Sequence, residues 1–185
     1  KNNPLSKYFF PSQKRTDMYF HKPVYSLNQN ETFNFLQQFR DMLDKDKFLL
    51  GEISAPIEII KKYLNGGLDL SFQFQSLEVK PDNNEIKNLI NLYEKNLPDP
   101  LIPTWVFSNH DQIRFISKIG NNRELMELFV MLQFTSRGIP IFYYGEEIGM
   151  TQSYIPLKDG KDALTENYRW VPEFLNKIIR KNLSL

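Results

Sequence analysis

The chain contains no cysteine, which excludes disulfide bonds, a catalytic thiolate and any zinc site built from thiolate ligands. It also lacks any apolar run near the ~20 residues that a membrane-spanning helix needs. The opening stretch KNNPLSKYFF does not resemble a signal peptide, because its apolar part is short and no small-residue cleavage site follows. The absence of a disulfide framework leads us to expect a location in the cytoplasm.

The charged residues do not indicate a class of binding partner, because the two signs are nearly balanced. Lys and Arg number 23, Asp and Glu number 22, and the net charge is +1. This balance favours neither nucleic acid nor a membrane surface, so we expect neither as a partner. Only two histidines occur, and no His-Glu-x-x-His, Gly-x-Gly-x-x-Gly, P-loop or Gly-x-Ser-x-Gly motif is present. We therefore expect no metal, no cofactor and no nucleophilic serine.

Short apolar runs alternate with amphipathic segments along the middle of the chain. The spacing of apolar residues predicts helices over 31–45, 55–67, 82–96 and 123–138, and a further helix after Pro172. Strands are expected over 47–53, 68–74, 103–109 and 139–145. This alternation is typical of βαβ units and a parallel sheet. An open doubly wound sheet and a (β/α)8 barrel both satisfy it, although no nucleotide-binding motif supports the open sheet.

Polar residues follow three of the expected strands. Glu52 ends the first strand, Asn109-His110-Asp111 the third, and the pair 146–147 follows the fourth. In a barrel the carboxyl ends of all strands face the same way and build the active site. Glu52 and Asp111 would then meet over one pocket, although they lie far apart in the sequence.

Two carboxylates without a metal or cofactor suit the cleavage of a glycosidic bond. One acid protonates the leaving oxygen, while a carboxylate on the opposite side attacks the anomeric carbon or activates water. Polar side chains nearby are candidates to bind sugar hydroxyls or to hold the carboxylates in place: Asn109, His110, Gln112 and Arg114. Aromatic side chains are candidates to stack on sugar rings: Phe72, Phe74, Trp105, Tyr143 and Tyr144.

Plainer interpretations of the same residues stay open. Glu52 alone is also typical of a surface residue or a helix cap. His110 and Asp111 alone could form a structural hydrogen-bonded pair. The aromatic side chains are equally typical of core packing, which we favour for Phe72 and Phe74.

Three segments, FLLGEIS, WVFSNHDQIR and GIPIFYYGEEIGM, resemble glycoside hydrolase family 13, the α-amylase family. They are most similar to the branch of oligo-1,6-glucosidases, α-glucosidases and trehalose-6-phosphate hydrolases, which carries Asn-His-Asp-Gln-Pro-Arg and Tyr-Tyr-Gly-Asp-Glu-Ile-Gly-Met. YSLNQNETFNFLQQFR resembles the helix before the fifth barrel strand, and IPLKDGKDALTENYRWVPEFL the segment after the eighth. The resemblance covers nearly the whole chain and implies part of a (β/α)8 barrel, strands five to eight with their helices.

The resemblance also implies roles for individual residues. Glu52 would be the general acid/base, and Asp111 would stabilise the transition state by holding sugar hydroxyls. His110 would bind the same ring, with Asn109 and Arg114 as further substrate-binding residues and Arg114 at the pocket mouth.

Two positions in these motifs depart from the family. Glu146 stands where the family has Asp, which keeps the charge and lengthens the side chain. Ile113 replaces the proline before the arginine. Neither change removes a catalytic group.

The family's nucleophile, an Asp in a Gly-Phe-Arg-x-Asp segment that ends strand four, has no counterpart in these 185 residues. Asp17 has the right Arg-x-Asp spacing, but the surrounding PSQKRTD is polar and follows no strand, so we do not expect it to serve. We expect residues 1–30 to form an irregular linker after strand four, and residues 31–185 the C-terminal half of the barrel. The chain would then be a fragment of a retaining α-glucosidase that acts on oligosaccharides or disaccharides. It would be inactive alone, with the N-terminal half barrel as a partner.

Two alternatives belong to other functional classes. The first is a non-catalytic homologue that acts as a binding or partner domain, similar to the glycosidase-like ectodomain of amino-acid transporter heavy chains. The presence of Glu52, His110 and Asp111 argues against it. The second is an unrelated α/β binding module, which three motifs in the family's order argue against.

Overall fold

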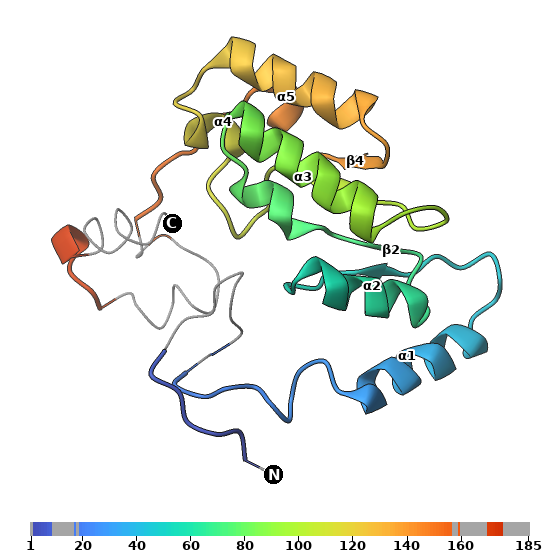
Figure 1. The fold of residues 1–185 in the computed structure, drawn as a ribbon. Coiled ribbons are helices and arrows are strands. Elements are labelled where there is room, and N and C mark those ends of the chain that lie inside the picture. The colour runs from blue at the N-terminus through green and yellow to red at the C-terminus, as the bar shows by residue number, and fades with distance from the viewer. Residues whose placement is uncertain (1, 9–16, 18, 157–158, 160–169, 176–185) are drawn as a thin grey trace. The chain divides into compact units, whose positions relative to one another are not determined.

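A computed structural model describes residues 2–8, 17, 19–156, 159 and 170–175 (Figure 1). Residues 1–106 and 130–141 form one compact unit, and residues 107–129 and 142–185 form a second. Helices and short strands alternate along the chain between residues 30 and 148. This alternation confirms the order of elements that the apolar spacing predicts.

The longer helices coincide with the predicted ranges to within a few residues. They are α1 (Asn30–Met42), α2 (Ile57–Asn65), α3 (Asn83–Asn96) and α5 (Arg123–Thr135). Asp82 caps α3, because its side chain accepts hydrogen bonds from the backbone N–H groups of Asn84 and Glu85. The last turn of α2 ends at Gly66, which again follows from the sequence.

The strands are shorter than expected and pair in parallel. They are β1 (Leu50–Gly51), β2 (Leu70–Ser71), β3 (Thr104–Val106) and β4 (Ile139–Ile141). β1 pairs with β2, and β3 pairs with β4. Helix α2 connects the first pair, and α4 (Phe115–Lys118) with α5 connects the second. The predicted βαβ connections are therefore confirmed.

Side chains link β2 to β3, since the described residues of these two strands share no backbone ladder. The Thr104 hydroxyl lies 2.9 Å from the Ser71 carbonyl oxygen and accepts the Gln73 N–H at 3.0 Å. The Ser76 hydroxyl, in the 3-10 helix η1 (Phe74–Glu78), donates to the Val106 carbonyl at 2.7 Å and accepts the Val106 N–H at 3.0 Å. These buried hydroxyls satisfy backbone groups that a longer strand would pair.

Trp105 lies in the core of the first unit. The residue is 1% exposed, and its ring packs edge-on against Tyr93 with the centroids 5.0 Å apart. Gln133 donates from Nε2 to the Trp105 carbonyl at 2.8 Å. The suggestion that Trp105 stacks on sugar is therefore wrong, because burial leaves its ring no face for a ligand. Phe72 and Phe74 stack on each other, with centroids 5.9 Å apart.

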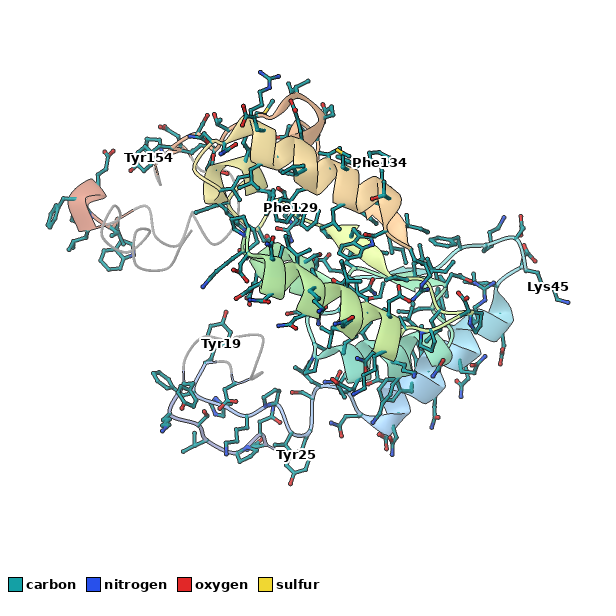
Figure 2. All side chains as sticks on the ribbon, turned by 45° about the horizontal axis from the view of Figure 1, so that its top comes forward. Tyr19, Tyr25, Lys45, Phe129, Phe134 and Tyr154 are labelled. Carbon is teal, nitrogen blue, oxygen red and sulfur yellow. The ribbon has the colours of Figure 1, made fainter. Side chains whose placement is uncertain are left out.

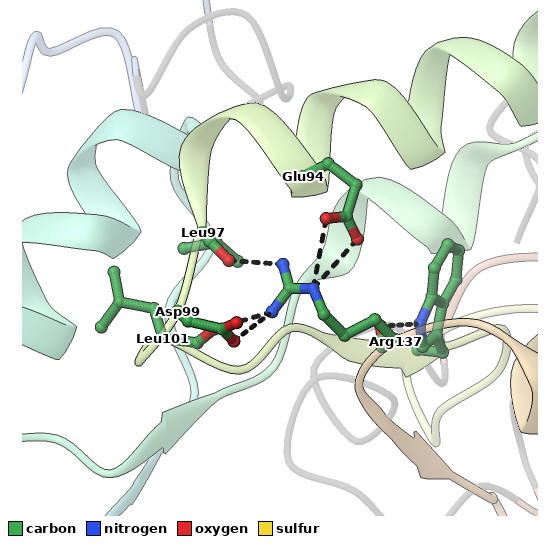
Figure 3. A network of polar contacts seen from close by, with 6 residues as sticks. Glu94, Leu97, Asp99, Leu101 and Arg137 are labelled. Carbon is green, nitrogen blue, oxygen red and sulfur yellow. Dashed lines mark hydrogen bonds and ion pairs between the residues drawn. The ribbon is translucent and has the colours of Figure 1, made fainter.

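Arg137 ties the end of α3 to the start of β4 (Figure 3). Its Nε donates to Glu94 at 3.0 Å, and its Nη1 donates to the Leu101 carbonyl at 3.0 Å and lies 3.6 Å from Asp99 Oδ1. The Trp105 indole N–H donates back to the Arg137 carbonyl at 3.1 Å. One guanidinium thus holds the 97–101 loop against the strand pair.

Three phenylalanines form the centre of the second unit. Phe107 follows β3, Phe115 opens α4 and Phe129 lies on α5, and their ring centroids are 4.6 to 5.2 Å apart. Figure 2 shows Phe129 on α5, where it is 2% exposed, whereas Phe134 near the end of the same helix is 64% exposed.

Residues near the two ends of the sequence add little regular structure to the described part. Leu5 and His21 form one antiparallel bridge, and the Ser6 hydroxyl donates to Asp17. A linker over residues 1–30 stays a prediction. Residues 173–175 begin a helical turn, but most of the helix expected after Pro172 lies outside the described residues. Within the described ranges, no helix has the length and apolar character to cross a membrane.

Thr104→Val should lower the free energy of unfolding by between about 1 and 3 kcal/mol, because it leaves the buried Gln73 N–H and Ser71 carbonyl without this partner. Urea denaturation measures the change. The matched control is Thr135→Val, an exposed helical site that should shift stability by less than about 0.5 kcal/mol. Equal midpoints for Thr104→Val and wild type would show that the link between β2 and β3 is unimportant.

Candidate active site

Glu52 is the first residue after β1, and it is exposed. The Gly51 carbonyl just before it accepts the Phe72 N–H at 3.0 Å, and the chain then continues to Pro56, the N-cap of α2. Glu52 therefore lies at the carboxyl end of a parallel strand, as the sequence predicts. Its catalytic role stays a prediction.

Asn109, His110 and Asp111 form a turn after β3. The Asn109 side chain accepts the Asp111 N–H at 3.1 Å, which closes the turn locally. His110 Nε2 lies 3.4 Å from Asp111 Oδ1, and the two side chains are 69% and 63% exposed. The contact is long and open to solvent, so both side chains are accessible to a ligand.

The two parts of the predicted site belong to different units. Glu52 lies in the first unit, whereas the segment from Asn109 to Arg114 lies in the second. Their convergence over one pocket, expected from a barrel, stays a prediction. The described residues include no group of three or more His, Asp or Glu side chains suited to a metal ion.

Arg114 is buried, with 8% of the residue exposed. Its Nη1 donates to the Tyr144 carbonyl at 2.7 Å, and its guanidinium lies 4.9 and 4.8 Å from the ring centroids of Tyr143 and Tyr144. The backbone N–H of Arg114 donates to Gln152 at 3.1 Å. The structure thus places this side chain beneath the two tyrosines, and a direct substrate contact at a pocket mouth stays a prediction.

Glu146 opens the 3-10 helix η2 (Glu146–Ile148) and is 6% exposed. Its Oε2 accepts the Tyr143 N–H at 2.8 Å, while Oε1 lacks a hydrogen-bond partner in the described part of the chain. Burial raises the pKa of this carboxyl group, although the Ser108 hydroxyl, the Tyr143 amide and the Arg114 guanidinium act in the opposite direction.

The turn before Glu146 requires glycine. Gly145 has a φ of +87°, and a Cβ there would lie 2.9 Å from Met150 Cβ and 3.1 Å from Arg114 Nη1. The Gly145 N–H donates to Glu147 Oε2 at 2.8 Å. The stretch 143–147 is therefore a tight turn packed on Arg114.

A family model described as "Alpha amylase, catalytic domain" matches residues 3–173. The chain belongs to the α-amylase family. This finding confirms the resemblance that the three motifs carry, and with it the expectation of a glycoside hydrolase family.

Relatives and solved structures agree with this membership. The chain is 33% identical over 157 residues to an α-glucosidase of Apis mellifera. The aligned region covers 79% of this chain and 27% of the relative. It is 29% identical over 182 residues to an oligo-1,6-glucosidase of Heyndrickxia coagulans, covering 85% of this chain and 33% of the relative.

Among solved structures, the crystal structure of an α-amylase from H. orenii matches with a TM-score of 0.61 at 25% identity, over 76% of this chain and 31% of the other. The chain thus spans about a quarter to a third of the length of these three proteins. The fold is part of the (β/α)8 barrel of the α-amylases, as predicted.

Sequence reasoning treated Glu146 only as a mild departure from the family and passed over Ser108. Both are buried, and both are polar. The signal available in the sequence was the run of two acidic residues directly after Tyr-Tyr-Gly at a strand end. That run does not reveal which of the two is buried.

Glu146→Gln should change how stability depends on pH. Because the folded chain holds this proton above the ordinary pKa of 4.5, the unfolded chain ionises first as the pH rises. Wild type therefore loses stability from about pH 4.5 upward, until the pKa of the folded state has been passed, and the variant escapes this loss. Urea unfolding at a series of pH values should show the variant gaining on wild type between acid and neutral pH.

Glu147→Gln provides the control, since Glu147 is the exposed neighbour. The pH-dependent gain in stability of Glu146→Gln should exceed any gain that this control shows. Parallel curves for Glu146→Gln and wild type would contradict a raised pKa at Glu146.

Proposed function

We propose that this chain contributes the acid/base and part of the sugar-binding apparatus of a retaining α-glucosidase that hydrolyses α-glucosidic bonds in oligosaccharides or disaccharides. The observation that carries the proposal is the position of Glu52 directly after β1 and of His110-Asp111 in the turn that follows β3, exposed in both cases. Membership of the α-amylase family and the names of the two relatives support it.

In this proposal Glu52 acts twice. It protonates the departing glycosidic oxygen, and it then removes a proton from the water that releases the sugar. Asp111 accepts hydrogen bonds from hydroxyls of the ring at which the bond is cut, while His110 and Asn109 donate or accept further hydrogen bonds. The stabilisation by Asp111 is greatest where positive charge develops on the sugar ring.

The attacking carboxylate comes from a segment outside these 185 residues, because no Gly-Phe-Arg-x-Asp motif occurs in them. In a retaining glycosidase this carboxylate stands about 5 to 5.5 Å from the acid/base. The partner of this chain is therefore the barrel half that carries strand four. We expect the complete protein in the cytoplasm, on the ground that the chain has no cysteine.

The chain alone should not release nitrophenol from p-nitrophenyl α-glucoside. Removal of a catalytic group costs several orders of magnitude in rate, and the nucleophile is such a group. Colorimetric turnover measures the outcome, with Glu52→Gln and the exposed Glu58→Gln as matched variants. Turnover that Glu52→Gln abolishes and Glu58→Gln keeps would contradict the missing nucleophile and would direct attention to Asp17.

A chimera tests whether this chain supports catalysis when the rest of the barrel is present. In the oligo-1,6-glucosidase of Heyndrickxia coagulans, the aligned segment is replaced by this chain. The chimera should cleave the same substrate, and Glu52→Gln should lower kcat by about 100-fold to 10,000-fold. A folded chimera that binds maltose without turnover would overturn the glucosidase proposal in favour of a non-catalytic binding domain.

A further inference from the structure

The turn that carries His110 and Asp111 is exposed, but the residues on either side of it are buried. Ser108 is 2% exposed and Arg114 is 8% exposed. Within the described residues, the turn is closed by the hydrogen bond from the Asp111 N–H to Asn109 and by the long, solvent-exposed contact between His110 and Asp111, which hold its side chains weakly. What fixes its two ends therefore decides where the candidate catalytic groups stand.

Arg114 holds the far end of the turn against the segment after β4. Its guanidinium donates to the Tyr144 carbonyl at 2.7 Å, with the rings of Tyr143 and Tyr144 beside it. Its backbone N–H donates to Gln152 at 3.1 Å. A planar, permanently charged group suits this combination of stacking and hydrogen bonding, and a lysine would not reproduce it.

Ser108 and Glu146 hold the near end. The Ser108 hydroxyl accepts the Phe115 N–H at 2.9 Å, and it lies beside the Glu146 carboxylate. Glu146 in turn accepts the Tyr143 N–H at 2.8 Å. The segment 143–146 is thus hydrogen-bonded to the far end of the turn through Arg114, and its Glu146 carboxylate lies beside Ser108 at the near end.

A glutamate at position 146 lowers the stability of the fold. It is 6% exposed, and its Oε1 lacks a partner within the described residues. A buried carboxylate with an unsatisfied oxygen lowers stability, so packing alone does not explain it. Groups that cost stability and shape a neighbouring site are typical of functional centres.

We propose that Glu146 and Arg114 are positioning residues that fix the turn 109–111, and with it His110 and Asp111, against the segment after β4. The catalytic importance of fixing His110 and Asp111 rests on the proposed function, whereas the fixing of the turn itself does not. In this role Arg114 acts through the turn, by way of its contacts with Tyr143 and Tyr144.

The test is backbone relaxation of the 15N-labelled full chain. In wild type the amides of residues 109–111 should have order parameters near about 0.85, as in rigid backbone. Glu146→Gln should lower them below about 0.6 at these residues. Glu146→Asp, which keeps the charge, should restore most of the loss. Glu147→Gln is the control at the exposed neighbour and should leave them unchanged.

Unchanged order parameters in Glu146→Gln, or an equal loss in Glu147→Gln, would overturn the proposal. If Glu146→Gln unfolds the second unit, the signals of Phe107, Phe115 and Phe129 collapse together, and Arg114→Lys then decides. It should loosen residues 109–111 while the three phenylalanine signals stay dispersed, and a rigid turn in this variant would refute the assignment. No substrate is used, so failure of the glucosidase proposal would not affect these outcomes.

Discussion

Each of the four described strands is two or three residues long, so backbone ladders satisfy only part of the buried peptide groups around them. Side chains must supply the rest. The hydroxyls of Thr104 and Ser76 bond to the backbone between β2 and β3, and Gln133 donates to carbonyls of β3 and β4. These polar residues lie in the core because an unpaired buried peptide group costs more than a buried hydroxyl or amide that is paired.

The same requirement organises the second unit around the candidate site. Arg114, Ser108 and Glu146 bond to backbone groups of the segments after β3 and β4. Here the solution includes a buried carboxylate whose pKa is raised, which makes the arrangement less stable than an apolar one. This less stable arrangement occurs where the segments after β3 and β4 lie together, beside His110 and Asp111. In the first unit, the neutral hydroxyls of Thr104 and Ser76 pair buried backbone groups without a charge.

Much of the architecture was predictable from local pattern. The helices follow from apolar residues at helical spacing and from end signals such as Asp82 and Gly66, because both act within a few residues of the chain. The strand limits were not predictable to the same degree. Residues such as Phe72 and Phe107 continue an apolar run beyond the point where a partner strand is available, and pairing depends on segments distant in sequence.

For the candidate site, the sequence by itself determined the family, the order of the strands and the placement of Glu52 and Asp111 after strand ends, since motifs and alternation are properties of neighbouring residues. Only the tertiary structure decided which polar side chains are buried. Glu146 and Glu147 are adjacent and chemically alike, yet one lies beneath the turn beside Ser108 and the other is exposed. Trp105 likewise looked like a candidate for stacking on sugar, and packing against Tyr93 placed it in the interior. The structure also buries Arg114 against Tyr143 and Tyr144, and its substrate contact stays a prediction. Burial depends on contacts between distant segments, which no local pattern encodes.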